Sequence, residues 1–179
     1  MTGNGSAPGR VLVAGVGNVF LSDDGFGVAV VERLLRRGRM PAGVELVDSG
    51  IRGVHLAYRL LDGYRALVIV DAMQRGGRPG TVHILEHDLD GARDESGAEV
   101  PALDGHGMDP AAVLTLLDGL AASMGLERPV ERVFVIGCEP AVLDEGIGLS
   151  PAVAAAVEPG VRAVTALVTE LMIDEGVSR

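Results

Sequence analysis

Three short apolar runs, spaced so that a helical segment fits between each pair, most constrain the fold. The runs span Val11–Ala14, Val44–Val47, which contains Glu45, and Ala66–Val70. Continuous apolar stretches such as the first are typical of strands buried on both faces. Apolar residues recur at helical spacing from Gly27 to about Arg37, and Val54–Leu61 predicts a second, short helix. Two successive β-α-β units predict parallel strands joined by right-handed crossovers.

The second half of the chain predicts a different arrangement. A strand at Thr81–His87 follows the turn Gly76–Gly80 too closely for a helix to intervene, so we expect it to run antiparallel to its neighbour. Residues 88–107 are acidic, rich in glycine and without periodicity, which predicts a long loop. A helix, a strand and a last helix are predicted at Asp109 to about Met124, Arg132–Gly137 and Ser150 to about Ile173. Pro159-Gly160 should kink or interrupt that last helix.

These elements predict one α/β domain over residues 10–179, with a mostly parallel sheet of about five strands and one antiparallel strand. Residues 1–9 are small, glycine-rich and polar, and we expect a disordered N-terminal tail. A chain of 179 residues buries roughly 70% of its unfolded surface, enough for a core without disulfides.

Composition excludes several classes of function. The net charge is −10, which argues against nucleic acid or an anionic membrane as a partner. All 15 basic residues are Arg, so chemistry that requires a lysine is excluded. Cys138 is the one cysteine, which rules out an internal disulfide and is compatible with a reducing cytosol. No apolar run approaches the roughly 18 residues of a membrane span, and the N-terminus does not resemble a secretory signal.

Acidic residues lie at the ends of all three predicted strands. Asp23 and Asp24 occupy the glycine-rich turn after the first strand, Asp48 follows the second and Asp71 follows the third. In open α/β sheets, ligands bind beyond the carboxyl ends of the strands. A single Asp there most often caps a helix or turn, but three converging ends favour a ligand site. Adjacent acids would repel a phosphate and attract a metal ion or a proton.

Other motifs in the sequence suggest other functions, and each departs from the pattern that its function requires. Gly15–Gly17 begins like a dinucleotide fingerprint, but Phe20 replaces the third glycine. The spacing of the acids resembles that of a receiver domain, which needs a lysine that this chain lacks. His83–His87 matches the H-x-x-E-H zinc motif, yet its flanks predict a strand, which would separate the two histidines by roughly 13 Å. We interpret Cys138 as a small buried hydrophobe.

Three candidate ligands remain, and they come from distant segments: Asp24, Asp71 and His106. His106 is flanked by glycines just before the helix predicted from Asp109. Two carboxylates and one imidazole suit a divalent transition metal such as nickel or zinc, with a position open for water or substrate.

Several short segments occur in a specific order and spacing. They are Gly15–Asn18, Asp23–Gly27, Val68–Ala72, Pro79–Thr81, His106 before a helix, Gly137 with Pro140, and Gly148–Val153. Together, over nearly the whole chain from Val11 to about Leu171, they resemble the endopeptidases that mature the large subunit of nickel–iron hydrogenases. The resemblance implies a three-layer α/β/α sandwich. It also implies that Asp24, Asp71 and His106 bind metal, and we assign catalysis to the two aspartates.

The same resemblance bears on substrate binding, to which we assign Asp48, Asn18 and Arg52. Asp48 matches a recurrent acid of that family, and Asn18 belongs to the matching turn. Residues 49–53 read Ser-Gly-Ile-Arg-Gly, where the family more often has Gly-Gly-Thr-x-Gly. Arg52 is therefore a departure that bears on contact with the substrate.

The implied activity is removal of a short C-terminal extension from a hydrogenase large-subunit precursor once nickel is in place. Nickel would then be carried by the precursor and recognised by the three ligands. Cleavage would use a metal-polarised carbonyl or water, or a carboxylate as general base. The alternative is a non-catalytic nickel-binding chaperone or checkpoint module for the same precursor. We expect a cytoplasmic monomer that binds neither nucleic acid nor a membrane.

Overall fold

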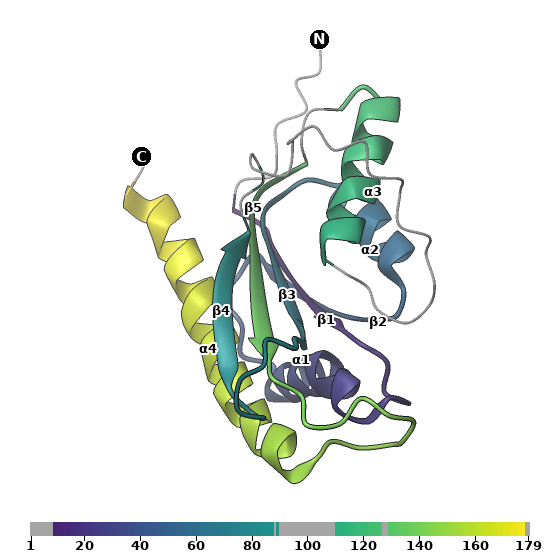
Figure 1. Ribbon diagram of the computed structural model, residues 1–179. Helices are drawn as coiled ribbons and strands as arrows, with labels where there is room; N and C mark the ends of the chain where they lie inside the picture. The colour runs from purple at the N-terminus through teal and green to yellow at the C-terminus, as the bar shows by residue number, and fades with distance from the viewer. Residues whose placement is uncertain (1–8, 88, 90–109, 127–128, 178–179) are drawn as a thin grey trace.

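A five-stranded mixed sheet forms the centre of the molecule (Figure 1). The computed structural model describes residues 9–87, 89, 110–126 and 129–177. In the strand order β2-β1-β3-β5-β4, the first four strands are parallel and β4 is antiparallel to β5. The strands are β1 (Val11–Val16), β2 (Val44–Gly50), β3 (Tyr64–Ala72), β4 (Val82–His87) and β5 (Val130–Cys138). The predicted α/β fold with one antiparallel strand is confirmed.

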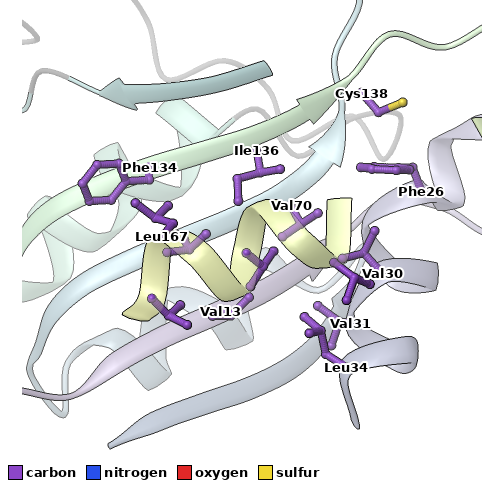
Figure 2. Packing of buried hydrophobic residues seen from close by; sticks show 14 of the residues in the cluster. Val13, Phe26, Val30, Val31, Leu34, Val70, Phe134, Ile136, Cys138 and Leu167 are labelled. Carbon is purple, nitrogen blue, oxygen red and sulfur yellow. The ribbon is translucent and has the colours of Figure 1, made fainter. Parts of the chain in front are cut away.

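Helices cover both faces of the sheet, which makes three layers (Figure 1). The helices are α1 (Phe26–Arg37), α2 (Gly53–Leu60), α3 (Pro110–Ser123) and α4 (Pro151–Val177). Alternate residues of each central strand point to opposite faces. In β1, Val11 and Val13 pack with α1 and α4, whereas Leu12 and Ala14 pack with α2 and α3. Figure 2 shows the α1/α4 side, where Phe26 and Leu167 approach the sheet.

Two glycines let α1 begin directly against the sheet. A Cβ at Gly27, in the first turn of α1, would collide with the carbonyl oxygens of Val16 and Val70. A Cβ at Gly15 would lie 2.5 Å from the carbonyl oxygen of Gly27. The start of α1 therefore sits over the carboxyl ends of β1 and β3, and the short 3₁₀ helix η1 (Ser22–Gly25) precedes it there.

Helix α4 runs without interruption through Pro159, so the predicted interruption is wrong, whereas a kink there stays a prediction. Packing explains the continuity, because a Cβ at Gly160 would lie 2.9 Å from Phe26 Cζ and 3.0 Å from Val30 Cγ2. The close contact with α1 that glycine permits offsets the helix hydrogen bond that proline removes. Within the described residues, one stretch, Pro151–Asp174, is long and apolar enough to cross a membrane. Its buried valines pack on the sheet instead.

Several predicted features fall on residues outside the described part of the chain. They are residues 1–8 of the tail predicted over residues 1–9, whose last residue, Gly9, is described and buried, and nearly all of the long loop over residues 88–107. The four parallel strands are longer than predicted, and β2, for example, continues to Gly50, whereas β4 begins one residue later than predicted, at Val82. Asp48 therefore belongs to the strand and does not follow it.

Candidate active site at the carboxyl edge of the sheet

Strand register brings two of the predicted acids to the same edge of the sheet. β1 is flanked by β2 and β3, and Gly15 pairs with Asp48 on one side and with Val70 on the other. Asp71 is the next residue along β3 and pairs with Gly137 of β5. Because all four of these strands are parallel, their carboxyl ends open toward one region, where ligands bind in such sheets.

Asp24 reaches this region from η1 and is fixed by the turn after β1. Its Oδ2 accepts the backbone N–H of Asn18 at 2.7 Å, while the Asn18 side chain accepts the N–H of Phe20 at 3.0 Å. The Asn18 side chain thus shapes the turn, and its backbone N–H orients the Asp24 carboxylate. Both residues are half-buried.

Gly17 is the point where Asp24 and Asp71 meet. Its φ is +128°, and a Cβ there would overlap the carbonyl oxygen of Asp24 and lie 3.6 Å from Asp71 Oδ1. The two acidic residues therefore border the same small space, which only a glycine leaves open. Asp71 Oδ1 also accepts the N–H of Ala72 at 2.8 Å, which orients this half-buried carboxylate.

The β2 side of the edge carries Asp48 and Arg52, both exposed. Asp48 Oδ1 accepts the N–H of Gly50 at 3.1 Å. The Gly50 carbonyl in turn accepts the N–H of Gly17 at 3.0 Å, which connects this segment to the turn of β1. Arg52 immediately precedes α2. Asp48 and Arg52 thus belong to a segment that is bonded to the turn containing Gly17, and their side chains are exposed.

Asp23 differs from Asp24 in that it is fully buried. Its carboxylate accepts two backbone N–H groups from the loop after β5, Ala141 at 2.8 Å and Val142 at 2.9 Å. It also accepts both the N–H and the hydroxyl of Ser150, at 2.6 and 2.9 Å. Burial raises the pKa of Asp23, but these hydrogen bonds outweigh it and hold the pKa below its usual value. Asp23 is thus a brace between η1 and the start of α4.

Glu139 is a second buried carboxylate that the sequence did not indicate. It is 3% exposed and accepts the backbone N–H groups of Arg75, at 2.9 and 3.1 Å, and of Gly76, at 3.0 Å. Burial raises the pKa of Glu139, but the hydrogen bonds outweigh burial and hold this pKa below its usual value. Its role is to fix the turn after β3, close to Asp71. The one feature of the sequence that could have indicated Glu139 is its position as an acid directly after an apolar strand.

Two sequence-based interpretations concern residues other than these acids, and Ser150, which immediately precedes α4, is described with them. Cys138 is buried in the core, and burial raises the pKa of its thiol to about 11, so it is protonated at neutral pH and is not a nucleophile. His83 and His87 lie on β4, as predicted, and not on a helix. Ser150 accepts the Ala154 N–H through its backbone carbonyl, while its hydroxyl binds Asp23.

The third predicted metal ligand, His106, lies outside the described residues. Among the residues that the structure describes, no group of three His, Cys, Asp or Glu side chains could hold a metal ion. The Asp24 backbone carbonyl and Asp71 Oδ1 both lie near Gly17, and metal binding by Asp24, Asp71 and His106 is a prediction.

Comparisons with known proteins agree on one family. A family model described as hydrogenase maturation protease matches residues 28–167. The Hydrogenase 2 maturation protease of Escherichia coli (strain K12) is 36% identical over 162 residues, covering 90% of this chain and 92% of that protein. Hydrogenase expression/formation protein HupD of Rhodobacter capsulatus is 35% identical, covering 84% of this chain and 67% of that protein. The solved structure of hydrogenase maturating endopeptidase HybD from E. coli has a TM-score of 0.68 at 34% identity, and the match covers 90% of this chain and 93% of that chain.

Proposed function

This chain belongs to the hydrogenase maturation protease family, and we propose that it removes the C-terminal extension of a nickel–iron hydrogenase large-subunit precursor after nickel insertion. Membership makes the chain a hydrolase, an endopeptidase of hydrogenase maturation. The observation that carries the finer proposal is the approach of Asp71 Oδ1 and the backbone of Asp24 to one point at Gly17. Both acids are accessible at the edge of the sheet where ligands bind.

Nickel enters this proposal as cargo of the substrate. Asp24 and Asp71 would offer it carboxylate oxygens, and His106 an imidazole nitrogen, a donor set that suits a divalent transition metal. The hydrogen bond from Asn18 to Asp24 and that from Ala72 to Asp71 orient the carboxylates in advance. Preorganised ligands of this kind favour a metal that arrives on another molecule, because less ordering remains to be done on docking.

Cleavage needs either an activated water or a polarised peptide carbonyl. Asp24 or Asp71 would act as general base toward water, or nickel on the precursor would polarise the carbonyl. Asp48 and Arg52 are exposed beside the acidic pair and would contact the polypeptide, while Asn18 would act through the turn that it shapes. The net charge of −10 supports a partner other than nucleic acid, and we propose a cytoplasmic monomer.

The test compares two matched substitutions of aspartate by asparagine. Asp71→Asn should abolish processing of nickel-loaded precursor, followed as the loss of the extension by mass spectrometry. Asp62→Asn, which changes an exposed acid in the turn before β3 at the opposite end of the sheet, should process normally. Full processing by Asp71→Asn would contradict the assignment of that residue.

The same experiment addresses the non-catalytic alternative. A chaperone or checkpoint module would bind the nickel-loaded precursor without shortening it. A stable wild-type complex in which the precursor keeps its full mass would therefore favour the alternative. Loss of the extension in the presence of the purified wild-type protein alone would support the protease.

A further inference from the structure

An exposed apolar surface adjoins the acidic pair. It consists of side chains from the turn after β1 and the loop after β5, which we call the apolar rim: Val19, Phe20, Val142, Leu143 and Ile147. Ile147 is 87% exposed and Phe20 is 65% exposed. The chain has three phenylalanines, and the other two, Phe26 and Phe134, are buried in the core. Exposed apolar clusters with a polar surround mark interaction sites.

Backbone hydrogen bonds hold the two loops of the rim together. The Gly146 N–H donates to the Phe20 carbonyl at 2.9 Å, and the Ser22 N–H donates to the Gly146 carbonyl at 3.0 Å. Leu21 and Gly146 form an isolated parallel bridge, and the two segments run beside one another in Figure 1. Asp23, which is buried beneath the rim, connects the same two loops, because its carboxylate accepts the N–H groups of Ala141 and Ser150. The rim is therefore preorganised, which lowers the cost of binding.

The rim is continuous with the candidate active site. Phe20 donates its backbone N–H to the side chain of Asn18, whose own N–H binds Asp24 Oδ2. A polypeptide lying on the rim would thus pass directly beside the carboxylate that we assign to catalysis. Asp144 and Glu145, both exposed on the same loop, add negative charge to this surface.

We propose that the apolar rim is the docking surface for the segment of the hydrogenase precursor next to the scissile bond, and that this segment presents apolar side chains beside a basic group. The inference rests on the proposed function, since it concerns the substrate of that site. Charge favours the precursor segment over a second copy of this chain as the molecule that binds the apolar rim. Two copies would bring Asp144 and Glu145 of each, within molecules of net charge −10, into repulsive contact.

Two isoleucine substitutions provide a matched test. Ile147→Ser changes the rim, whereas Ile173→Ser changes an isoleucine that is 61% exposed near the far end of α4. Both side chains lie mostly in solvent, so both variants should fold normally. We expect Ile147→Ser to raise the KM for nickel-loaded precursor about tenfold, with kcat little changed. Ile173→Ser should match the wild type, and Phe20→Ser should behave like Ile147→Ser.

The possible outcomes separate this inference from the proposed function. Wild-type processing with an unchanged KM in both Ile147→Ser and Phe20→Ser would overturn the docking surface and leave the protease intact. A wild-type protein that neither binds nor cleaves the precursor would overturn both. Self-association of the wild type that Ile147→Ser abolishes, measured by sedimentation, would assign the rim to a second copy and overturn the inference.

Discussion

Asp23 and Asp24 are adjacent in sequence and occupy opposite environments. Asp23 is fully buried and accepts four hydrogen bonds, all from the loop after β5 and its last residue, Ser150. Asp24 is half-buried, accepts the N–H of Asn18 and borders the space around Gly17. The two neighbouring acids therefore have different roles: Asp23 holds the loops in place, and Asp24 is available to a ligand.

This division predicts different costs for the same substitution. Asp23→Asn places an amide group among four donors and should lower the free energy of unfolding by about 3 kcal/mol. Asp24→Asn should cost less than about 1 kcal/mol, because a half-exposed group retains water as a partner. Urea denaturation of the two variants measures the difference. Equal losses of stability would contradict the separate roles.

At the scale of elements, periodicity predicted the sheet and its helices but not all their limits. Val11–Ala14 and Ala66–Val70 were recognisable because strands buried on both faces are continuously apolar. Pro159 misled the prediction of α4, because the contact of Gly160 with Phe26 is a tertiary effect that local propensity does not contain. The prediction of a strand over His83–His87 was confirmed by β4.

The candidate site was predictable only as a set of positions. Asp48 and Asp71 could be assigned to one edge, because parallel strands place their carboxyl ends together. The burial of Asp23 could not be predicted, since it depends on a loop more than one hundred residues away. The burial of Glu139 could not be predicted either, because the backbone N–H groups that donate to its carboxylate come from the turn after β3. Long-range hydrogen bonds leave no periodic trace in a sequence.

The packing of α4 on α1 predicts opposite effects of two glycine-to-alanine substitutions. Gly160→Ala would place a Cβ 2.9 Å from Phe26 Cζ, and we expect a net loss of about 1–2 kcal/mol despite the better helix propensity. Gly119→Ala in α3 meets nothing within 4 Å and should stabilise the protein by up to about 1 kcal/mol. Thermal denaturation checks both. A stabilising Gly160→Ala would contradict the close contact.

At the scale of the whole molecule, folding lowers the pKa of five carboxyl groups among the described residues: Asp23, Glu45, Glu86, Glu139 and Glu158. For Glu86 and Glu158 the main cause is a hydrogen bond from an arginine. For the other three, burial opposes the shift and the hydrogen bonds outweigh it. Folding therefore favours the ionised form of each group.

The sign of these shifts predicts sensitivity to acid. A carboxyl group with a lowered pKa in the folded state stabilises the fold above its unfolded pKa, about 4. That contribution is lost as the pH falls through the folded value. We expect the urea midpoint to be nearly constant from about pH 7 to 5 and to fall steeply below about pH 4.5. Glu45→Gln should reduce the fall of the urea midpoint at acidic pH, and Asp118→Asn, which changes an exposed residue, should not. A midpoint independent of pH would contradict this account.

The position of nickel is the prediction that bears on the molecule as a whole. Asp71 is fixed on β3 and Asp24 on η1, and together with His106 they would form a set of two carboxylates and one imidazole. Such a site binds nickel modestly compared with a thiolate-rich one, and it leaves coordination positions open. Metal should therefore bind firmly only when the precursor supplies further ligands, which would make cleavage a checkpoint for metal insertion.

The checkpoint predicts that processing requires nickel in the precursor and not nickel added to the protease. Purified protease is mixed with nickel-loaded or nickel-free precursor, in a chelator that removes free metal, and the precursor mass is followed with time. Only the loaded precursor should be shortened, and protease pretreated with chelator should be as active as untreated protease. Incubating the protease with nickel before mixing should not rescue the nickel-free precursor. Equal cleavage of both precursors would defeat the checkpoint and indicate a protease that acts without regard to metal.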